Sequence, residues 1–203
     1  SNLRSRQRMS DPVVTSGDEL TVDDVEAFTG GRLLAADAET QRLLDAAVAA
    51  ARRYCGWHVC PVWASHQLVL DGHGGRVLRL PTRNLLAIDD VIDDGVTVDV
   101  DTLHWAADGM VRKATGGRWS HTYRGVDVVI TDGYTEVEAA DWRQAVLKMV
   151  DLMASGGRPD SELTVKKVDD VQYQWTPATG ADQAVLSVAA TLDGYLAGQV
   201  FFA

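Results

Sequence analysis

The residues best suited to chemistry lie between positions 55 and 73. The side chains of this segment that can ligate a metal are those of Cys55, His58, Cys60, His66, Asp71 and His73. A zinc site needs four such ligands converging on one ion. The spacing follows no zinc-finger pattern, and the segment must pass through a helix end, a proline turn and a strand. We therefore predict no metal ion and no cofactor.

The two cysteines are too few for a disulfide scaffold, so a reducing compartment is expected. A bond between Cys55 and Cys60 would require the turn at Gly56 to bring their Cα atoms within about 7 Å. Other patterns do not predict catalysis either. Ser120 and His121 are neighbours on an extended segment and face opposite sides, and the glycine pairs lack the strand and helix that flank a phosphate loop.

Composition excludes several classes of protein. The chain has 203 residues, of which 46% are hydrophobic and 24% charged. These fractions are those of an ordinary globular protein. The formal net charge of −10 argues against a protein that coats DNA, because neutralising phosphates needs a basic surface. No apolar run approaches the roughly 20 residues that cross a bilayer, so no membrane association is expected.

Hydrophobic periodicity predicts helices at both ends of the chain. The first runs over 21–28, where Thr21 is a good N-cap and Asp24 stands at the capping-box position. A second, rich in alanine, runs over 37–54, and a third begins at Asp141 and ends before Gly156. The last helix covers 181–196.

The middle of the sequence changes to the pattern of short strands. Two hairpins are predicted, one at Asp93-Asp94-Gly95 and one at Asp108-Gly109, because these turns separate apolar segments. We predict an α+β fold, mainly a helical bundle with an inserted small antiparallel β module and an extended C-terminal arm. The expected parts are a flexible N-terminal arm (1–19), the bundle (20–61 and 136–158), the β insert (62–135), the extended arm (159–180), and the C-terminal helix and tip (181–203).

Two C-terminal segments are expected to need a partner. Apolar and polar residues alternate loosely over 164–175, which predicts an extended arm or hairpin. Such an element has only marginal stability in isolation. The chain then ends in an apolar tip, where burial of each Phe would contribute about 1.5–3 kcal/mol. We take as interface candidates the apolar residues of these segments and one tyrosine of the last helix: Val168, Val171, Tyr173, Trp175, Tyr195, Val200, Phe201 and Phe202.

The segment 53–61 reads RYCGWHVCP and joins the alanine-rich helix to the β region. It resembles the head–tail adaptor (head-to-tail connector) proteins of long-tailed phages that infect actinobacteria. The helix 21–28 and the Asp132-Gly133-Tyr134 turn before Asp141-Trp142 are also similar, so the resemblance covers roughly residues 20–197. The signature residues are Tyr54, Cys55, Gly56, Trp57 and Pro61, and the motif is structural. Cys60 departs from the family pattern.

The resemblance implies a non-enzymatic virion protein at the head–tail junction, assembled in the cytoplasm of the bacterial host. It implies a ring of about twelve identical subunits under the portal protein, with a stopper or neck protein on the far side. DNA would pass through the channel without sequence-specific binding, and an acidic wall would let it slide. Within the signature, Tyr54 and Trp57 are expected to pack between the core of the helical bundle and the β insert.

Three other functions compete with this one. Another neck component, such as a stopper or tail-completion protein, would be richer in strands. A small metal-dependent hydrolase would use His58, His66, Asp71 and His73. A DNA-binding module would use the basic patch of Arg112, Lys113, Arg118 and Arg124 around Trp119.

Overall fold

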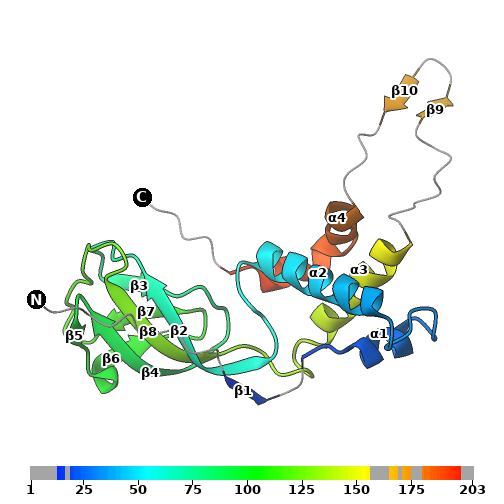
Figure 1. The fold of residues 1–203 in the computed structure, drawn as a ribbon. Coiled ribbons are helices and arrows are strands. Elements are labelled where there is room, and N and C mark those ends of the chain that lie inside the picture. Colours follow the sequence, from blue (N-terminus) through cyan, green and yellow to red (C-terminus); the bar gives the residue numbers. More distant parts are fainter. Residues whose placement is uncertain (1–12, 17–18, 156–164, 169–170, 175–179, 198–203) are drawn as a thin grey trace, which may run out of the picture. The chain divides into compact units, whose positions relative to one another are not determined.

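The chain folds into two compact units, one of helices and one of strands (Figure 1). The computed structural model describes residues 13–16, 19–155, 165–168, 171–174 and 180–197. Contacts group 20–56 with 140–196 in the helical unit, and 57–139 with the N-terminal strand in the sheet unit. The sheet unit is thus inserted into the sequence of the helical unit. Its observed boundaries lie between residues 56 and 57 and between residues 139 and 140, whereas the sequence pattern predicts them between 61 and 62 and between 135 and 136. The predicted α+β class is confirmed.

The described helices of the helical unit are α1 (Val22–Phe28), α2 (Ala38–Cys55), α3 (Ala140–Ala154) and α4 (Gly180–Leu192), followed by the 3-10 turn η2 (Asp193–Tyr195). The capping box predicted for α1 is present, because the Thr21 hydroxyl accepts from the Asp24 amide and the Asp24 carboxylate accepts from the Thr21 amide. Asp37 caps α2, which ends at Gly56 in the left-handed conformation. The third helix begins at Ala140, one residue before the cap expected at Asp141.

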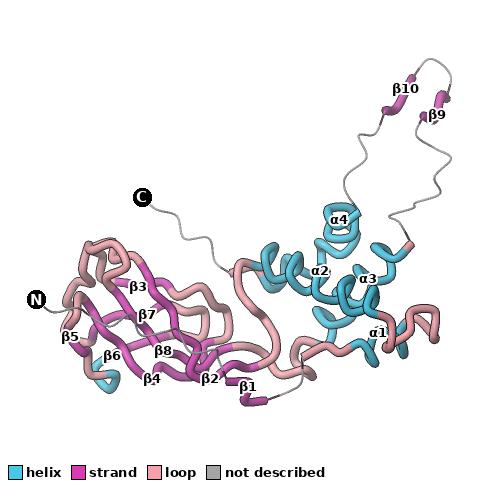
Figure 2. The backbone as a smooth tube through the Cα atoms, viewed as in Figure 1, coloured by secondary structure: helices cyan, strands magenta, loops and turns pink. Residues whose placement is uncertain are grey.

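Helix α3 packs against both α2 and α4 (Figure 2). Its buried face includes Trp142, Val146 and Met149, which are at most 2% exposed. Alanines such as Ala47 line the buried face of α2, and small side chains of this kind allow helices to approach closely. The helical bundle predicted from hydrophobic periodicity therefore corresponds to the observed helical unit.

The strands of the sheet unit form two antiparallel sheets (Figure 2). The larger has the order β1-β2-β8-β4-β5, and the smaller the order β3-β7-β6. Their bounds are β1 (Val13–Ser16), β2 (Val62–Leu70), β3 (Val77–Arg79), β4 (Leu85–Asp93), β5 (Val96–Thr97), β6 (Leu103–Trp105), β7 (Met110–Lys113) and β8 (Val126–Asp132). The 3-10 turn η1 (Val100–Thr102) precedes β6.

Both predicted hairpins are present, β4 with β5 and β6 with β7. Asp94 and Gly95 have φ values of 52° and 81°. A two-residue hairpin turn of type I′ requires positive values at both central residues. The flexible N-terminal arm expected over 1–19 differs from the structure at residues 13–16. These residues form β1, which pairs with β2 and so provides ladder hydrogen bonds to an edge that would otherwise be open.

One hydrophobic core joins the two sheets. Strand β8 alternates strictly between buried and half-buried positions, and Val126, Val128 and Ile130 are its inward apolar residues. The smaller sheet contributes Leu78, Leu103 and Val111 to the same core.

The segment predicted as an arm or hairpin contains β9 (Val165–Val168) and β10 (Val171–Gln174), which pair antiparallel. Of the two forms predicted for this segment, an extended arm or a hairpin, the structure shows a hairpin. Among the described strands, β9 and β10 pair only with each other. The expected interface residues Trp175, Val200, Phe201 and Phe202 lie outside the described residues.

Candidate functional site

The signature segment is divided between the two units. Tyr54, Cys55 and Gly56 end α2 in the helical unit, whereas Trp57 and Pro61 begin the sheet unit. The Tyr54 hydroxyl donates to Oδ1 of Asp193 at 2.6 Å, which ties α2 to η2. This hydrogen bond to a carboxylate raises the pKa of Tyr54.

Both cysteines are buried, and no disulfide joins them. The Cys55 thiol donates to the carbonyl of Leu192 at 3.8 Å, within the helical core. Burial raises the pKa of Cys55 to about 11, because the core disfavours the thiolate. A buried thiol with a raised pKa is a packing residue and a poor nucleophile.

The structure places only some of the interface candidates. Val168, Val171 and Tyr173 lie in the β9–β10 hairpin. Tyr195 lies in η2, where its hydroxyl donates to the carboxylate of Asp141 at the start of α3. Tyr195 therefore has a role inside the helical unit in addition to any role at a surface.

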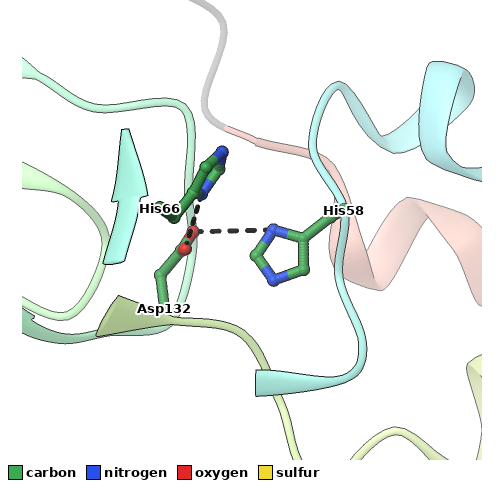
Figure 3. A group of neighbouring side chains, drawn as sticks. All are labelled: His58, His66 and Asp132. Carbon is green, nitrogen blue, oxygen red and sulfur yellow. Dashed lines mark hydrogen bonds and ion pairs between the residues drawn. The ribbon is translucent and has the colours of Figure 1, made fainter. Parts of the chain in front are cut away.

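Within the described ranges, His58, His66 and Asp132 form a buried cluster of side chains that can ligate a metal (Figure 3). Nδ1 of His66 lies 2.9 Å from Oδ1 of Asp132, and Nδ1 of His58 lies 3.8 Å from Oδ2. The Asp132 side chain is fully buried, and those of His58 and His66 are 3% and 19% exposed. We call these three residues the histidine–aspartate cluster.

Strand irregularity brings His66 into this cluster. Trp63 is opposite Asp132 on β8 and His66 is opposite Ile130, so β2 uses one more residue than β8 over the same span. Within this bulge Ser65 has a φ of 53°. The extra residue places Trp63 and His66 on the same face of the sheet. That face is the inward one, because Asp132 continues the alternation of Val128 and Ile130.

Aromatic packing fixes His58. Its ring stacks on Trp63 with centroids 4.0 Å apart and an interplanar angle of 5°. The Trp57 ring makes a T-shaped contact with His58, with centroids 5.4 Å apart. Gly133 lies directly against the same ring, since a Cβ at this position would be 2.6 Å from Nε2 of His58. The cluster is therefore held by close packing on several sides.

The sequence identifies part of this cluster. His58 and His66 are among the predicted candidate ligands, and the structure brings them together. Asp71 is not part of the cluster, and its carboxylate accepts a hydrogen bond from the amide of Arg124 at 2.8 Å. The cluster also does not include Cys55, Cys60 or His73. At Asp132 the sequence predicts only a turn. The period-two pattern of 126–132 is the available signal, because it places Asp132 inward with the valines.

A second charged pair lies in the β module. Nζ of Lys113 donates to Oδ2 of Asp93 at 2.6 Å and lies 4.8 Å above the ring of Trp119, while the Ser120 amide donates to Oδ1. Burial raises the pKa of Asp93, but the hydrogen bonds from Lys113 and Ser120 outweigh it and hold the pKa below its usual value. Trp119 is 1% exposed. It is therefore not available to stack on a base, as the DNA-binding alternative requires.

An apolar patch lies on the smaller sheet. It surrounds a hollow of about 320 Å³ lined by Val77, His104, Trp105, Ala106, Met110, Val111 and Arg112. Val77, Trp105 and Met110 are 41%, 43% and 36% exposed. We call these three side chains the Trp105 patch. Exposed apolar patches of this kind are common at protein interfaces.

No described helix is long and apolar enough to span a membrane. No protein-family model matches the sequence, and the comparison with curated proteins finds no match. Solved structures do match in fold. One chain, from the neck of an empty GTA particle computed with C6 symmetry, has a TM-score of 0.55 at 16% identity, with 91% of this chain and 92% of that chain covered. Another, from the neck of a native GTA particle computed with C12 symmetry, has a TM-score of 0.55 at 14% identity, with 94% and 98% covered.

Proposed function

We propose that this chain is a neck subunit of a tailed phage or phage-like particle and acts there as the head–tail adaptor. The observation that carries this proposal is the extent of the fold likeness. More than nine-tenths of this chain aligns with more than nine-tenths of neck chains from GTA particles, so the likeness includes both the helical and the sheet regions. A shared single domain would leave much of one chain uncovered.

The proposed assembly is a ring of about twelve identical subunits, for which the C12 symmetry of one neck structure is the support. A ring needs a heterologous interface, in which one surface of a subunit binds a different surface of the next. The hairpin β9–β10 and the Trp105 patch offer two different surfaces for such contacts. An isolated two-stranded hairpin is marginal in water and gains stability by packing against a neighbour.

The finer proposal concerns the partners. The ring would bind the portal protein on one side and a stopper or neck protein on the other, using the hairpin residues Val168, Val171, Tyr173 and Trp175, the tip residues Val200, Phe201 and Phe202, and Tyr195. The net charge of −10 favours a channel wall that repels phosphate, so DNA would pass without sequence-specific binding. The protein would act at the head–tail junction of the virion after assembly in the host cytoplasm, and it would not be an enzyme.

Binding to heads tests this role. Purified chain is mixed with tailless heads that carry the portal, and in parallel with shells that lack it, and both are sedimented. An adaptor should sediment with the portal-bearing heads and not with the shells that lack the portal. A chain that does not bind these heads but binds isolated tails is a tail-completion protein. A chain that binds the heads only after an adaptor has bound them is a stopper.

A further inference from the structure

We propose that the histidine–aspartate cluster is a binding site for one divalent transition-metal ion, of which zinc has the best fit. One ligand atom from each of His58, His66 and Asp132 can be chosen so that all lie within 4.8 Å of one another (Figure 3). Two come from β2 or the segment before it, and the third from the end of β8. This site is independent of the proposed neck function.

The donor atoms select the class of ion. Two imidazole nitrogens and one carboxylate oxygen suit zinc and its neighbours in the first transition row. Calcium takes six to eight oxygen ligands, and magnesium prefers oxygen ligands and keeps much of its water, so neither suits this set. A fourth position would be taken by water.

The charge balance of the cluster also favours a cation. The carboxylate of Asp132 is fully buried, and within the described part of the chain its Oδ2 accepts no hydrogen bond. This oxygen lies 3.8 Å from Nδ1 of His58. Such a separation is beyond hydrogen-bond distance. A buried carboxylate with incomplete compensation is costly, and a divalent ion beside it would supply the missing charge.

Close packing and strand pairing fix the positions of two of the three ligands. His58 is fixed by its stacking on Trp63 and by the contact with Gly133, and Asp132 is fixed by the ladder between β8 and its neighbours. Ligands around a tetrahedral zinc at about 2.0 Å are roughly 3.3 Å apart, so the widest pair must close by about 1.5 Å. His66, the most exposed of the three, follows a bulge and is the ligand best able to move.

Cobalt titration tests the site on the full chain, because tetrahedral Co²⁺ gives strong visible absorption that hexa-aqua Co²⁺ lacks. Wild-type protein should bind one Co²⁺ per chain with such a spectrum, and Zn²⁺ should displace it. His66→Gln and Asp132→Asn should each weaken binding at least about 100-fold, since each removes one of three ligands. His73→Gln and His104→Gln are the matched controls and should bind as the wild type does.

A thermal scan gives a second reading that does not depend on colour. Zn²⁺ should raise the unfolding midpoint of the wild type and of both controls, because it binds only the folded state, and it should leave His66→Gln unchanged. His66→Gln is the decisive variant, since its side chain is partly exposed and its loss should leave the chain folded. Absence of a single tetrahedral site in the wild type, or equal binding by His66→Gln, would overturn the proposal.

Discussion

Gly133 and His58 are in such close contact that no other residue fits at position 133. A Cβ there would be 2.6 Å from Nε2 of His58 and equally close to the carbonyl oxygen of Pro61. Gly133 also has a φ of 116°. Residues with a Cβ rarely adopt this conformation. The Gly133 amide donates to the carbonyl of Asn84, and the Asn84 side chain donates back to Gly133. The turn after β8 therefore depends on glycine for both space and conformation.

Gly133→Ala should destabilise the protein by about 3 kcal/mol or more, from backbone strain and the collision with His58. Urea unfolding followed by tryptophan fluorescence measures this. Gly116→Ala is the matched control, because Gly116 has a φ of 72° but would have no atom within 4 Å of a new Cβ. The control should lose only about 1–2 kcal/mol. Equal losses in both variants would show that the contact with His58 contributes nothing.

The local elements of this fold can be predicted because their signals are local. The capping box of Thr21 and Asp24 and the hairpin turn at Asp94-Gly95 each depend on a few adjacent residues, and both are present. The pairing of β1 with β2 is different. It joins residues far apart in the sequence, and the short apolar segment of β1 follows a polar, arginine-rich stretch, so composition alone favours a flexible arm.

Stability should depend on pH through Asp93. Its pKa is held below the usual value in the folded state. Its pair with Lys113 therefore stabilises the protein fully above the unfolded pKa of about 3.9. This contribution is lost as the pH falls through the lower folded pKa. Asp93→Asn should therefore cost about 1–3 kcal/mol at neutral pH and much less near pH 2.

Urea unfolding of the wild type and Asp93→Asn across this pH range measures the difference. Asp90→Asn serves as the control, because Asp90 is exposed on the same strand. The control should remain within about 0.5 kcal/mol of the wild type at every pH. A cost for Asp93→Asn that did not shrink in acid would contradict the assigned ion pair.

The thiols should be inert in the folded protein. Both cysteines are 2% exposed. Because the pKa of Cys55 is about 11, only about one Cys55 side chain in a thousand is ionised at pH 8. A thiol reagent that releases a coloured product should therefore react with neither thiol until the protein is unfolded, and then with both. Ala114→Cys, at an exposed position of the sheet unit, should react at once and shows that the reagent is active. Rapid reaction of the wild type would contradict the burial of these side chains.

The Trp105 patch should contribute to contacts between copies of this chain in the proposed ring. Trp105→Ser and Met110→Ser should reduce attachment to portal-bearing heads about tenfold, because buried tryptophans dominate interface energies. The stability of the free subunit should change little, since both side chains are partly exposed. Val137→Ser, which alters an 80% exposed side chain of the same unit, is the control. Normal attachment of both patch variants would exclude the patch from the interface.

The histidine–aspartate cluster shows why the site is harder to predict than the elements. The residue types of His58 and His66 are visible in the sequence, but their convergence depends on one extra residue in β2, between Trp63 and His66. Without this bulge, residues three apart on a strand face opposite sides. No local pattern in the sequence marks that irregularity. The apolar patch also depends on tertiary packing, because Val77, Trp105 and Met110 lie on three different strands.

Counting the copies of this chain on each head tests the proposed ring at the neck. Portal-bearing heads saturated with the chain can be purified and imaged by electron cryomicroscopy without imposed symmetry. We expect a closed ring of about twelve copies at the single portal vertex, in keeping with the C12 symmetry of one similar neck structure. One copy per head, or copies scattered over the capsid surface, would contradict it.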